Sequence, residues 1–174
     1  MPGLAAAAAE PLSLTFRPSR EQGTNRLAGC LARAARKGDV IALVGDLGAG
    51  KTAFARAFVR ALCDPVEEVP SPTFTLVQIY EAPDFPIWHF DLYRIDDADE
   101  AIELGVEEAF ATAVSLIEWP ERLGRLLPAD RLEVRIAAPP DAGEEAREIV
   151  LLAGPAWGGR LAGVDRCFRA ADGG

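Results

Sequence analysis

Eight consecutive residues match the G-x-x-x-x-G-K-[ST] pattern of a phosphate-binding loop, or P-loop. They are Gly45, Asp46, Leu47, Gly48, Ala49, Gly50, Lys51 and Thr52. Glycines let the backbone turn tightly and bring its N–H groups against phosphate oxygens; the lysine ammonium meets the β- and γ-phosphates, and the threonine hydroxyl meets Mg²⁺. Lys51 also stands out because the chain holds only one other lysine, and an ammonium suits a phosphate cradle better than a guanidinium fork. The pattern predicts a site for a nucleoside triphosphate and Mg²⁺.

Two acidic residues each follow a short apolar run, as the acid of a Walker B element does. Asp91 follows residues 87–90, and Glu118 follows residues 114–117. Ligands of open α/β sheets bind beyond the carboxyl ends of the strands, so both acids are candidates for holding Mg²⁺ and positioning water. The alternative is an ordinary charge at a sheet edge, and Asp91 would point away from the site if its strand ran antiparallel.

Three further residues are candidates for the surroundings of these acids. Thr73 lies in a proline-bracketed loop, where it is either a switch hydroxyl for the γ-phosphate and Mg²⁺ or a polar turn that starts a strand. His89 is the sole histidine and shares a strand face with Asp91, and we interpret it as a packed structural side chain. Trp119 adjoins Glu118 and either stacks near the nucleotide or is buried at a strand end.

The apolar patterning places these residues on a series of helices and strands. Residues 40–44 form a continuous apolar run typical of a buried parallel strand, and residues 52–62 form an amphipathic helix whose first turn faces the phosphates. The other expected elements are a helix over 20–37 that ends at Gly38, strands over 73–80 and 87–92 with a connection short enough for an antiparallel pair, helical residues 97–113 interrupted at Gly105, and strands over 114–118, 132–137 and 149–152.

Length and element order predict one α/β domain. A chain of 174 residues has the usual size of a single domain and can bury roughly 70% of its unfolded surface. The elements predict a P-loop NTPase-like three-layer fold with a mixed parallel and antiparallel central sheet. We expect this domain over residues 14–154, a disordered N-terminal tail over 1–13, and a C-terminal tail or short helix over 155–174.

Charge argues against a broad nucleic-acid surface. The net charge is −9 and the predicted pI is near 4.7, whereas nucleic-acid binding depends on many cations that neutralise phosphates. We therefore expect any contact with RNA to be indirect or local. Residues 96–108 hold a dense group of acids, which is either a solvated helix face or a docking face for a partner protein.

Cysteine content and hydropathy predict a soluble cytoplasmic protein. Cys30, Cys63 and Cys167 are odd in number and share no short spacing, so we expect reduced thiols rather than a disulfide framework or a zinc site. Residues 1–11 lack the basic start and aliphatic run of a secretory signal. No apolar run approaches the roughly 18 residues that a membrane helix needs.

Four motifs together resemble the TsaE family, also called YjeE. They are the P-loop itself, SPTFTLV at 71–77, HFDLYR at 89–94 and IEWP at 117–120, and their order and spacing also match. The resemblance covers residues 14–152 and is far more specific than the P-loop alone. Members are bacterial ATPases required for tRNA threonylcarbamoyladenosine biosynthesis, and they act with the TsaB and TsaD proteins that transfer the threonylcarbamoyl group.

The resemblance also implies a role for each matching residue. Residues 47–52 would cradle the phosphates of ATP, Thr52 and Glu118 would serve Mg²⁺, Asp91 would be a second acid essential to hydrolysis, and Thr73 would belong to a nucleotide-sensing switch. Further implied neighbours of the nucleotide are Glu21, Gln22 and Thr24 near the adenine, and Gly143 and Arg147 later in the chain. Glu144 and Glu145 depart from the family, which often carries basic residues there.

Three functions compete at this point. The first is a Mg²⁺-dependent ATPase, a hydrolase that is weak alone and stimulated by the TsaB–TsaD complex. The second is a nucleotide or small-molecule kinase, whose arginine-bearing lid could draw on Arg122, Arg125 and Arg131, although no acceptor-binding signature accompanies them. The third is a GTP switch, but its guanine-recognising Asn-Lys-x-Asp element cannot exist here because no lysine follows Lys51. Adenine is therefore favoured.

Overall fold

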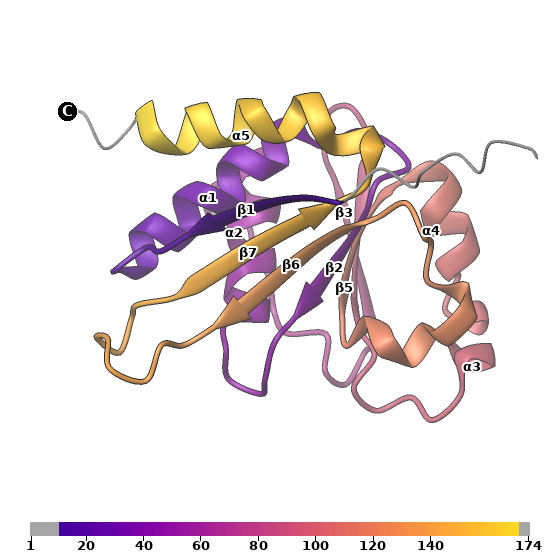
Figure 1. The fold of residues 1–174 in the computed structure, drawn as a ribbon. Coiled ribbons are helices and arrows are strands. Elements are labelled where there is room, and N and C mark those ends of the chain that lie inside the picture. Colours follow the sequence, from indigo (N-terminus) through magenta and orange to yellow (C-terminus); the bar gives the residue numbers. More distant parts are fainter. Residues whose placement is uncertain (1–10, 171–174) are drawn as a thin grey trace, which may run out of the picture.

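Seven strands form one mixed sheet within residues 11–170, the part of the chain that the computed structural model describes (Figure 1). Their order across the sheet is β1-β7-β6-β2-β5-β4-β3. The strands are β1 (Leu12–Phe16), β2 (Val40–Val44), β3 (Val77–Glu81), β4 (Pro86–Asp91), β5 (Val114–Glu118), β6 (Leu132–Ala137) and β7 (Glu148–Ala153). The helices are α1 (Glu21–Ala34), α2 (Lys51–Leu62), α3 (Ala98–Glu103), α4 (Val106–Thr112) and α5 (Gly158–Ala170), with 3₁₀ turns at Pro120–Leu126 and Pro155–Trp157.

The centre of the sheet is parallel and its margins are antiparallel. Strand β2 runs parallel to β5 and β6, and β5 runs parallel to β4. The pairs β3–β4, β6–β7 and β1–β7 are antiparallel. This confirms the predicted mixed sheet. It also excludes an antiparallel strand that would point Asp91 away from the site, because β4 pairs in parallel with β5 and thus ends at the same edge.

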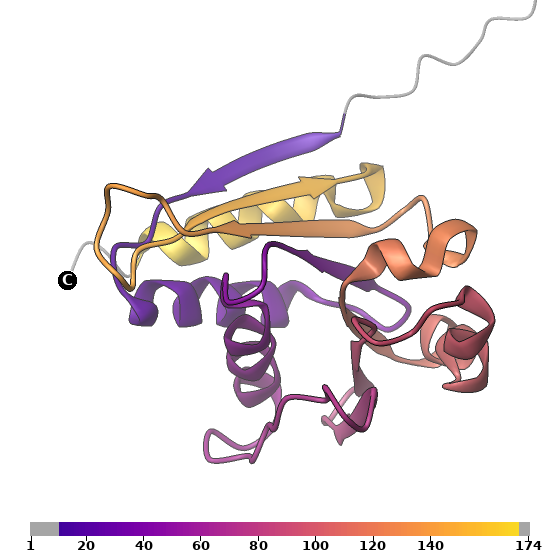
Figure 2. The ribbon, with the colours of Figure 1, turned by 90° about the horizontal axis from the view of Figure 1, so that it is seen from below.

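Helices cover both faces of the sheet and bury two apolar cores. Residues of α1, α2 and α5 pack with Leu43 and Leu116 on one face, whereas residues of α3 and α4 pack with Val40 and Ile117 on the other. Alternate residues of β5 therefore enter different cores, as the pleat of a strand requires. Helices α1 and α5 lie side by side, and α3 and α4 lie at the other end of the sheet (Figure 2). The predicted three-layer arrangement is confirmed.

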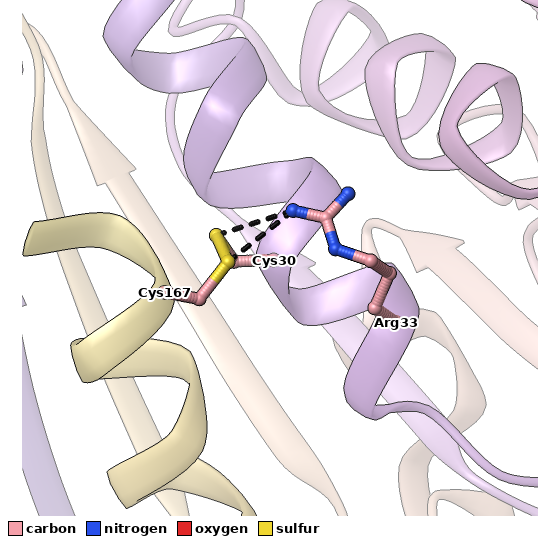
Figure 3. The surroundings of a disulfide bond; sticks show 3 residues. All are labelled: Cys30, Arg33 and Cys167. Carbon is pink, nitrogen blue, oxygen red and sulfur yellow. Dashed lines mark hydrogen bonds between the residues drawn. A yellow bond between two sulfur atoms is a disulfide. The ribbon is translucent and has the colours of Figure 1, made fainter. Parts of the chain in front are cut away.

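A disulfide between Cys30 and Cys167 corrects the expectation of reduced thiols. It joins α1 to α5 across 137 positions of sequence, with the two Cα atoms 5.8 Å apart (Figure 3). Arg33 donates hydrogen bonds from Nη2 to both sulfurs, at 3.5 Å to Cys30 and 3.2 Å to Cys167. Cys63 remains a free thiol. No short spacing signals this pair, because the packing of α5 on α1 alone brings the two residues together.

The ends of the domain differ from those expected. Strand β1 begins at Leu12, inside the range assigned to the N-terminal tail, and pairs with β7. Its five residues are mostly exposed at the sheet edge, so they carry little apolar signal. Within residues 155–174, where we expect a tail or a short helix, the structure has α5, which packs on α1. The rest of both tails, residues 1–10 and 171–174, lies outside the described residues.

The helical stretch after β4 is divided as predicted. Gly105 separates α3 from α4 and adopts φ 88°, a left-handed conformation that favours glycine. Helix α3 begins with a capping box, in which the Asp97 side chain accepts from Asp99 N–H and Glu100 accepts from the Asp97 N–H. Two acids of the 96–108 group therefore have a local structural role.

No helix within residues 11–170 has the length and apolar character that crossing a bilayer would require.

Candidate functional site

The P-loop connects the end of β2 to the start of α2, as the sequence predicts. Gly50 precedes α2 with φ 109°, where a residue with a Cβ is strained. At Gly45, an added Cβ would lie 2.5 Å from the Ile136 carbonyl oxygen, so the neighbouring strand β6 admits only glycine. No side chain caps the N-terminus of α2, and its first amides are therefore available to an anion, which the helix dipole also favours.

Lys51 is buried within the curve of the loop. Its ammonium donates to the carbonyl oxygens of Gly45 at 2.5 Å and Asp46 at 2.9 Å, and lies 4.4 Å from the centre of the Trp119 ring. Burial lowers the pKa of Lys51, and the negative charges of Glu118 and Asp91 oppose this shift. A desolvated cation in a backbone cradle is well suited to binding phosphate.

The two predicted acids lie side by side at the carboxyl edge of the sheet. Asp91 and Glu118 are register partners on β4 and β5, and both are buried. Glu118 Oε1 accepts a hydrogen bond from the Thr52 hydroxyl at 2.8 Å, which joins the acid to the P-loop helix. Asp91 accepts from the Thr73 hydroxyl at 3.2 Å through Oδ2 and from the Tyr93 N–H at 3.1 Å through Oδ1.

A cavity of about 370 Å³ unites these side chains. Its lining includes Lys51, Thr52, Thr73, Asp91 and Glu118. These five residues come from four parts of the chain: the P-loop, the loop before β3, and the ends of β4 and β5. Oxygen donors from Thr52 and the two acids could take a hard cation such as Mg²⁺, which uses one or two carboxylates together with substrate phosphates. Residues 11–170 hold no group of three or more His, Cys, Asp or Glu side chains arranged as a metal cage.

A second cavity, of about 440 Å³, lies on another side of the P-loop. Glu21 and Thr24 at the start of α1 line it, together with Gly50 and Arg147. Arg147 donates from Nε to the Ala49 carbonyl oxygen at 2.8 Å, so this late arginine supports the loop directly. The structure thus places Glu21 and Thr24 next to the P-loop, although their role toward adenine stays a prediction.

Some candidates lie away from both cavities. Gly143 lines neither one, and neither do Arg122, Arg125 and Arg131, the arginines of the possible kinase lid. Arg131 instead forms an ion pair with Glu133 at 2.7 Å.

Sequence reasoning missed two features of the site. The first is that Tyr93 and Arg94 also line the first cavity, a role that their place in the HFDLYR motif could have signalled. The second concerns His89, which is fully buried as expected but also contacts Glu118, with Nε2 and Oε1 2.9 Å apart. That contact depends on the pairing of β4 with β5, which the sequence alone did not specify.

Comparisons with known proteins support this fold and identify the family of the chain. The family model described as "Threonylcarbamoyl adenosine biosynthesis protein TsaE" matches residues 18–149. A TsaE protein of Rickettsia conorii is 43% identical over 118 residues, which are 68% of this chain and 67% of the relative. A TsaE protein of Bacillus subtilis is 38% identical over 141 residues, covering 80% of this chain and 85% of the relative. The crystal structure of Bacillus subtilis YdiB superimposes with a TM-score of 0.73 at 32% identity, covering 90% of this chain and 96% of that one. The chain therefore belongs to the TsaE family, whose members take part in tRNA threonylcarbamoyladenosine biosynthesis.

Proposed function

We propose that this protein is a Mg²⁺-dependent ATPase that supports transfer of the threonylcarbamoyl group to tRNA by the TsaB and TsaD proteins. The observation that carries the proposal is the convergence of Lys51, Thr52, Asp91 and Glu118 on one cavity at the carboxyl edge of the sheet. A binding loop alone requires neither acid, whereas hydrolysis requires groups that hold Mg²⁺ and position water. The proposed cellular location is the cytoplasm, where tRNA is modified.

The proposed chemistry is in-line attack of water on the γ-phosphate of ATP. Lys51 and the amides at the start of α2 stabilise the charge that develops on the phosphate oxygens. Thr52 and Glu118 hold Mg²⁺, which supplies further charge neutralisation when bound. Asp91 is anchored through both oxygens and orients the attacking water, while Thr73, its hydroxyl partner, links the loop over 71–76 to the state of the nucleotide.

We propose ATP rather than GTP as the nucleotide, with its base in the cavity beside Glu21 and Thr24. That cavity borders Ala49 and Gly50 of the P-loop, so a nucleotide whose phosphates occupy the loop can extend into it. A kinase activity gains no comparable support, because the arginines considered for its lid do not line the cavity.

The deciding experiment measures phosphate release from ATP by the purified chain alone and with a TsaB–TsaD complex. We expect slow turnover alone and at least about tenfold stimulation by the complex, a change of about 1.4 kcal/mol in the barrier. The matched control replaces the wild-type chain with Lys51→Ala at the same concentration, which reports any contaminating ATPase. Equal turnover with and without the complex would contradict the proposal, and labelled phosphate on a nucleoside or nucleotide acceptor would establish a kinase instead.

A further inference from the structure

The imidazole of His89 is in direct contact with the acid that reaches the P-loop helix. His89 lies on β4, one strand away from Glu118 on β5, and the parallel register brings the two side chains to the same face. His89 Nε2 and Glu118 Oε1 are 2.9 Å apart. The side chain of His89 is 0% exposed and that of Glu118 is 4% exposed, so water competes little for this contact.

The hydrogen-bonding environment identifies which ring nitrogen carries the proton. A carboxylate oxygen is an acceptor, so the contact is a hydrogen bond only when Nε2 carries the hydrogen. The other nitrogen, Nδ1, is buried and has no hydrogen-bond partner among the described residues. A proton on Nδ1 would therefore be an unsatisfied buried donor, which is costly. These two observations favour a proton on Nε2 rather than on Nδ1.

The contact also determines how the carboxylate of Glu118 is held. Both His89 Nε2 and the Thr52 hydroxyl reach the same oxygen, Oε1. Two donors from different elements restrict rotation of the carboxyl group, and Oε2 takes part in neither bond. A buried carboxylate without such donors would be strongly destabilised, and it would also be free to turn away from Thr52.

We propose that His89 is a positioning residue, which donates from Nε2 to Glu118 and thereby orients the carboxylate toward Thr52 and a bound Mg²⁺. This inference rests on the proposed function for the identity of the metal, but the hydrogen bond itself does not. Partners that hydrogen-bond a ligating carboxylate commonly change metal affinity about 10- to 100-fold when they are removed. His89 does not line the cavity proposed for the phosphates, so it would act through Glu118.

The first test is spectroscopic and uses the fact that His89 is the only histidine. Chain without a histidine tag is labelled with ¹⁵N-histidine, and the single imidazole is observed by NMR without nucleotide or Mg²⁺. We expect the signature of the Nε2–H tautomer and slow exchange of that proton with water. In Glu118→Ala the exchange should become faster. A wild-type ring that carries no proton on Nε2 would overturn the proposal.

The second test compares two substitutions of different donor capacity. His89→Gln keeps an N–H that can reach Glu118, whereas His89→Leu is apolar. Binding of a non-hydrolysable ATP analogue is measured by calorimetry with Mg²⁺ and with EDTA. We expect the Mg²⁺-dependent gain in affinity to fall by about tenfold or more in the leucine variant, to be largely kept in the glutamine variant, and the affinity in EDTA to be unchanged in both.

The matched control is Ser115→Ala. Ser115 is also a fully buried polar residue of β5, but it lies three positions before Glu118 and therefore faces the other core. We expect Ser115→Ala to keep the wild-type gain in affinity for the ATP analogue on addition of Mg²⁺. The proposal would be overturned if this gain fell equally in both His89 variants, or if His89→Leu kept the wild-type gain. If Mg²⁺ does not raise the affinity of the wild-type chain for the ATP analogue, the proposed function is contradicted, and so is the metal-related part of this inference. The NMR measurement of the Nε2 proton still decides whether His89 holds Glu118.

Discussion

At the scale of single residues, the site combines one buried cation with two buried acids. Lys51, Asp91 and Glu118 are each at most 5% exposed, and burial of charged groups is costly unless they are paired or hydrogen-bonded. Thr52 and Thr73 donate hydrogen bonds to the acids, His89 contacts Glu118, and Lys51 donates to carbonyl oxygens of the P-loop. These contacts offset part of the cost of burying the three charged groups.

Replacing Lys51 by alanine should abolish ATP hydrolysis and weaken ATP binding by at least about tenfold. The variant loses charge-assisted contacts to the phosphates, which are typically worth about 1.5–3 kcal/mol. Calorimetry and phosphate release measure the two effects. The only other lysine provides the control, since Lys37 is exposed at the turn before β2 and Lys37→Ala should behave as wild type. Intact hydrolysis in the Lys51 variant would refute the site.

Asp91→Asn and Glu118→Gln should each lower the hydrolysis rate at least tenfold, about 1.4 kcal/mol in the barrier, while the protein stays folded. Both substitutions conserve shape and remove the charge that would hold Mg²⁺ or orient water. Steady-state rates and circular dichroism are measured together. Glu107→Gln, on the exposed face of α4, is the control for a general effect of lost negative charge. Wild-type rates in the two site variants would remove their assignment.

At the scale of elements, α5 is attached to the domain by the Cys30–Cys167 disulfide and by apolar packing. Leu161 and Val164 of α5 are buried in the same core as α1 and α2. The helix lies beyond residue 149, where the match to the family model ends. In the proposed cytoplasmic location, cellular thiols would tend to reduce such a bond, so the stability of α5 packing would depend on the redox state.

Cys167→Ser should lower the Tm by about 5–15 °C under oxidising conditions. A disulfide that closes a long loop typically contributes about 2–4 kcal/mol, and each kcal/mol corresponds to about 2–4 °C for a chain of this size. Differential scanning calorimetry measures the shift. Reductant should bring the wild-type Tm close to that of the variant and leave the variant unchanged. Cys63→Ser is the matched control, because Cys63 is a free thiol. A variant Tm equal to that of wild type would show that the bond does not stabilise the fold.

At the scale of the whole molecule, seven acids gather on and just before α3 and α4. All seven acidic side chains at positions 96–108 are exposed, and α3 and α4 pack on the face of the sheet that does not carry α5. The exposure of these acids is compatible with both interpretations of the sequence, a solvated helix face and a docking face for a partner protein. With a net charge of −9, the molecule as a whole repels a polyanion.

The chain alone should therefore bind tRNA only weakly at physiological ionic strength, with a Kd above about 10⁻⁴ M, the weak end of non-specific binding. Fluorescence anisotropy with labelled tRNA measures this. The same titration with the TsaB–TsaD complex added should show binding, since we expect the partners to hold the tRNA. Micromolar binding by the chain alone that weakens with added salt would contradict an indirect role.

The sequence by itself determined the P-loop, the central strand β2, the helix α2 and the division of α3 from α4. Each depends on neighbouring residues: glycine spacing, a continuous apolar run, or a single glycine with a positive φ. The motif series also identified the family, because four short segments in one order are hard to obtain by chance. These signals are local, so they can be recognised without knowledge of the fold.

Only the tertiary structure decided which distant residues meet. The parallel pairing of β4 with β5 brings Asp91 beside Glu118 and gives Glu118 its contact with His89. The packing of α5 on α1 joins Cys30 to Cys167, and the pairing with β7 creates the short edge strand β1. Strand order, direction and register are properties of the whole sheet. A run of five apolar or alternating residues is compatible with many different orders, directions and registers. For this physical reason the sequence supplied the chemical groups of the site, and the fold determined their partners.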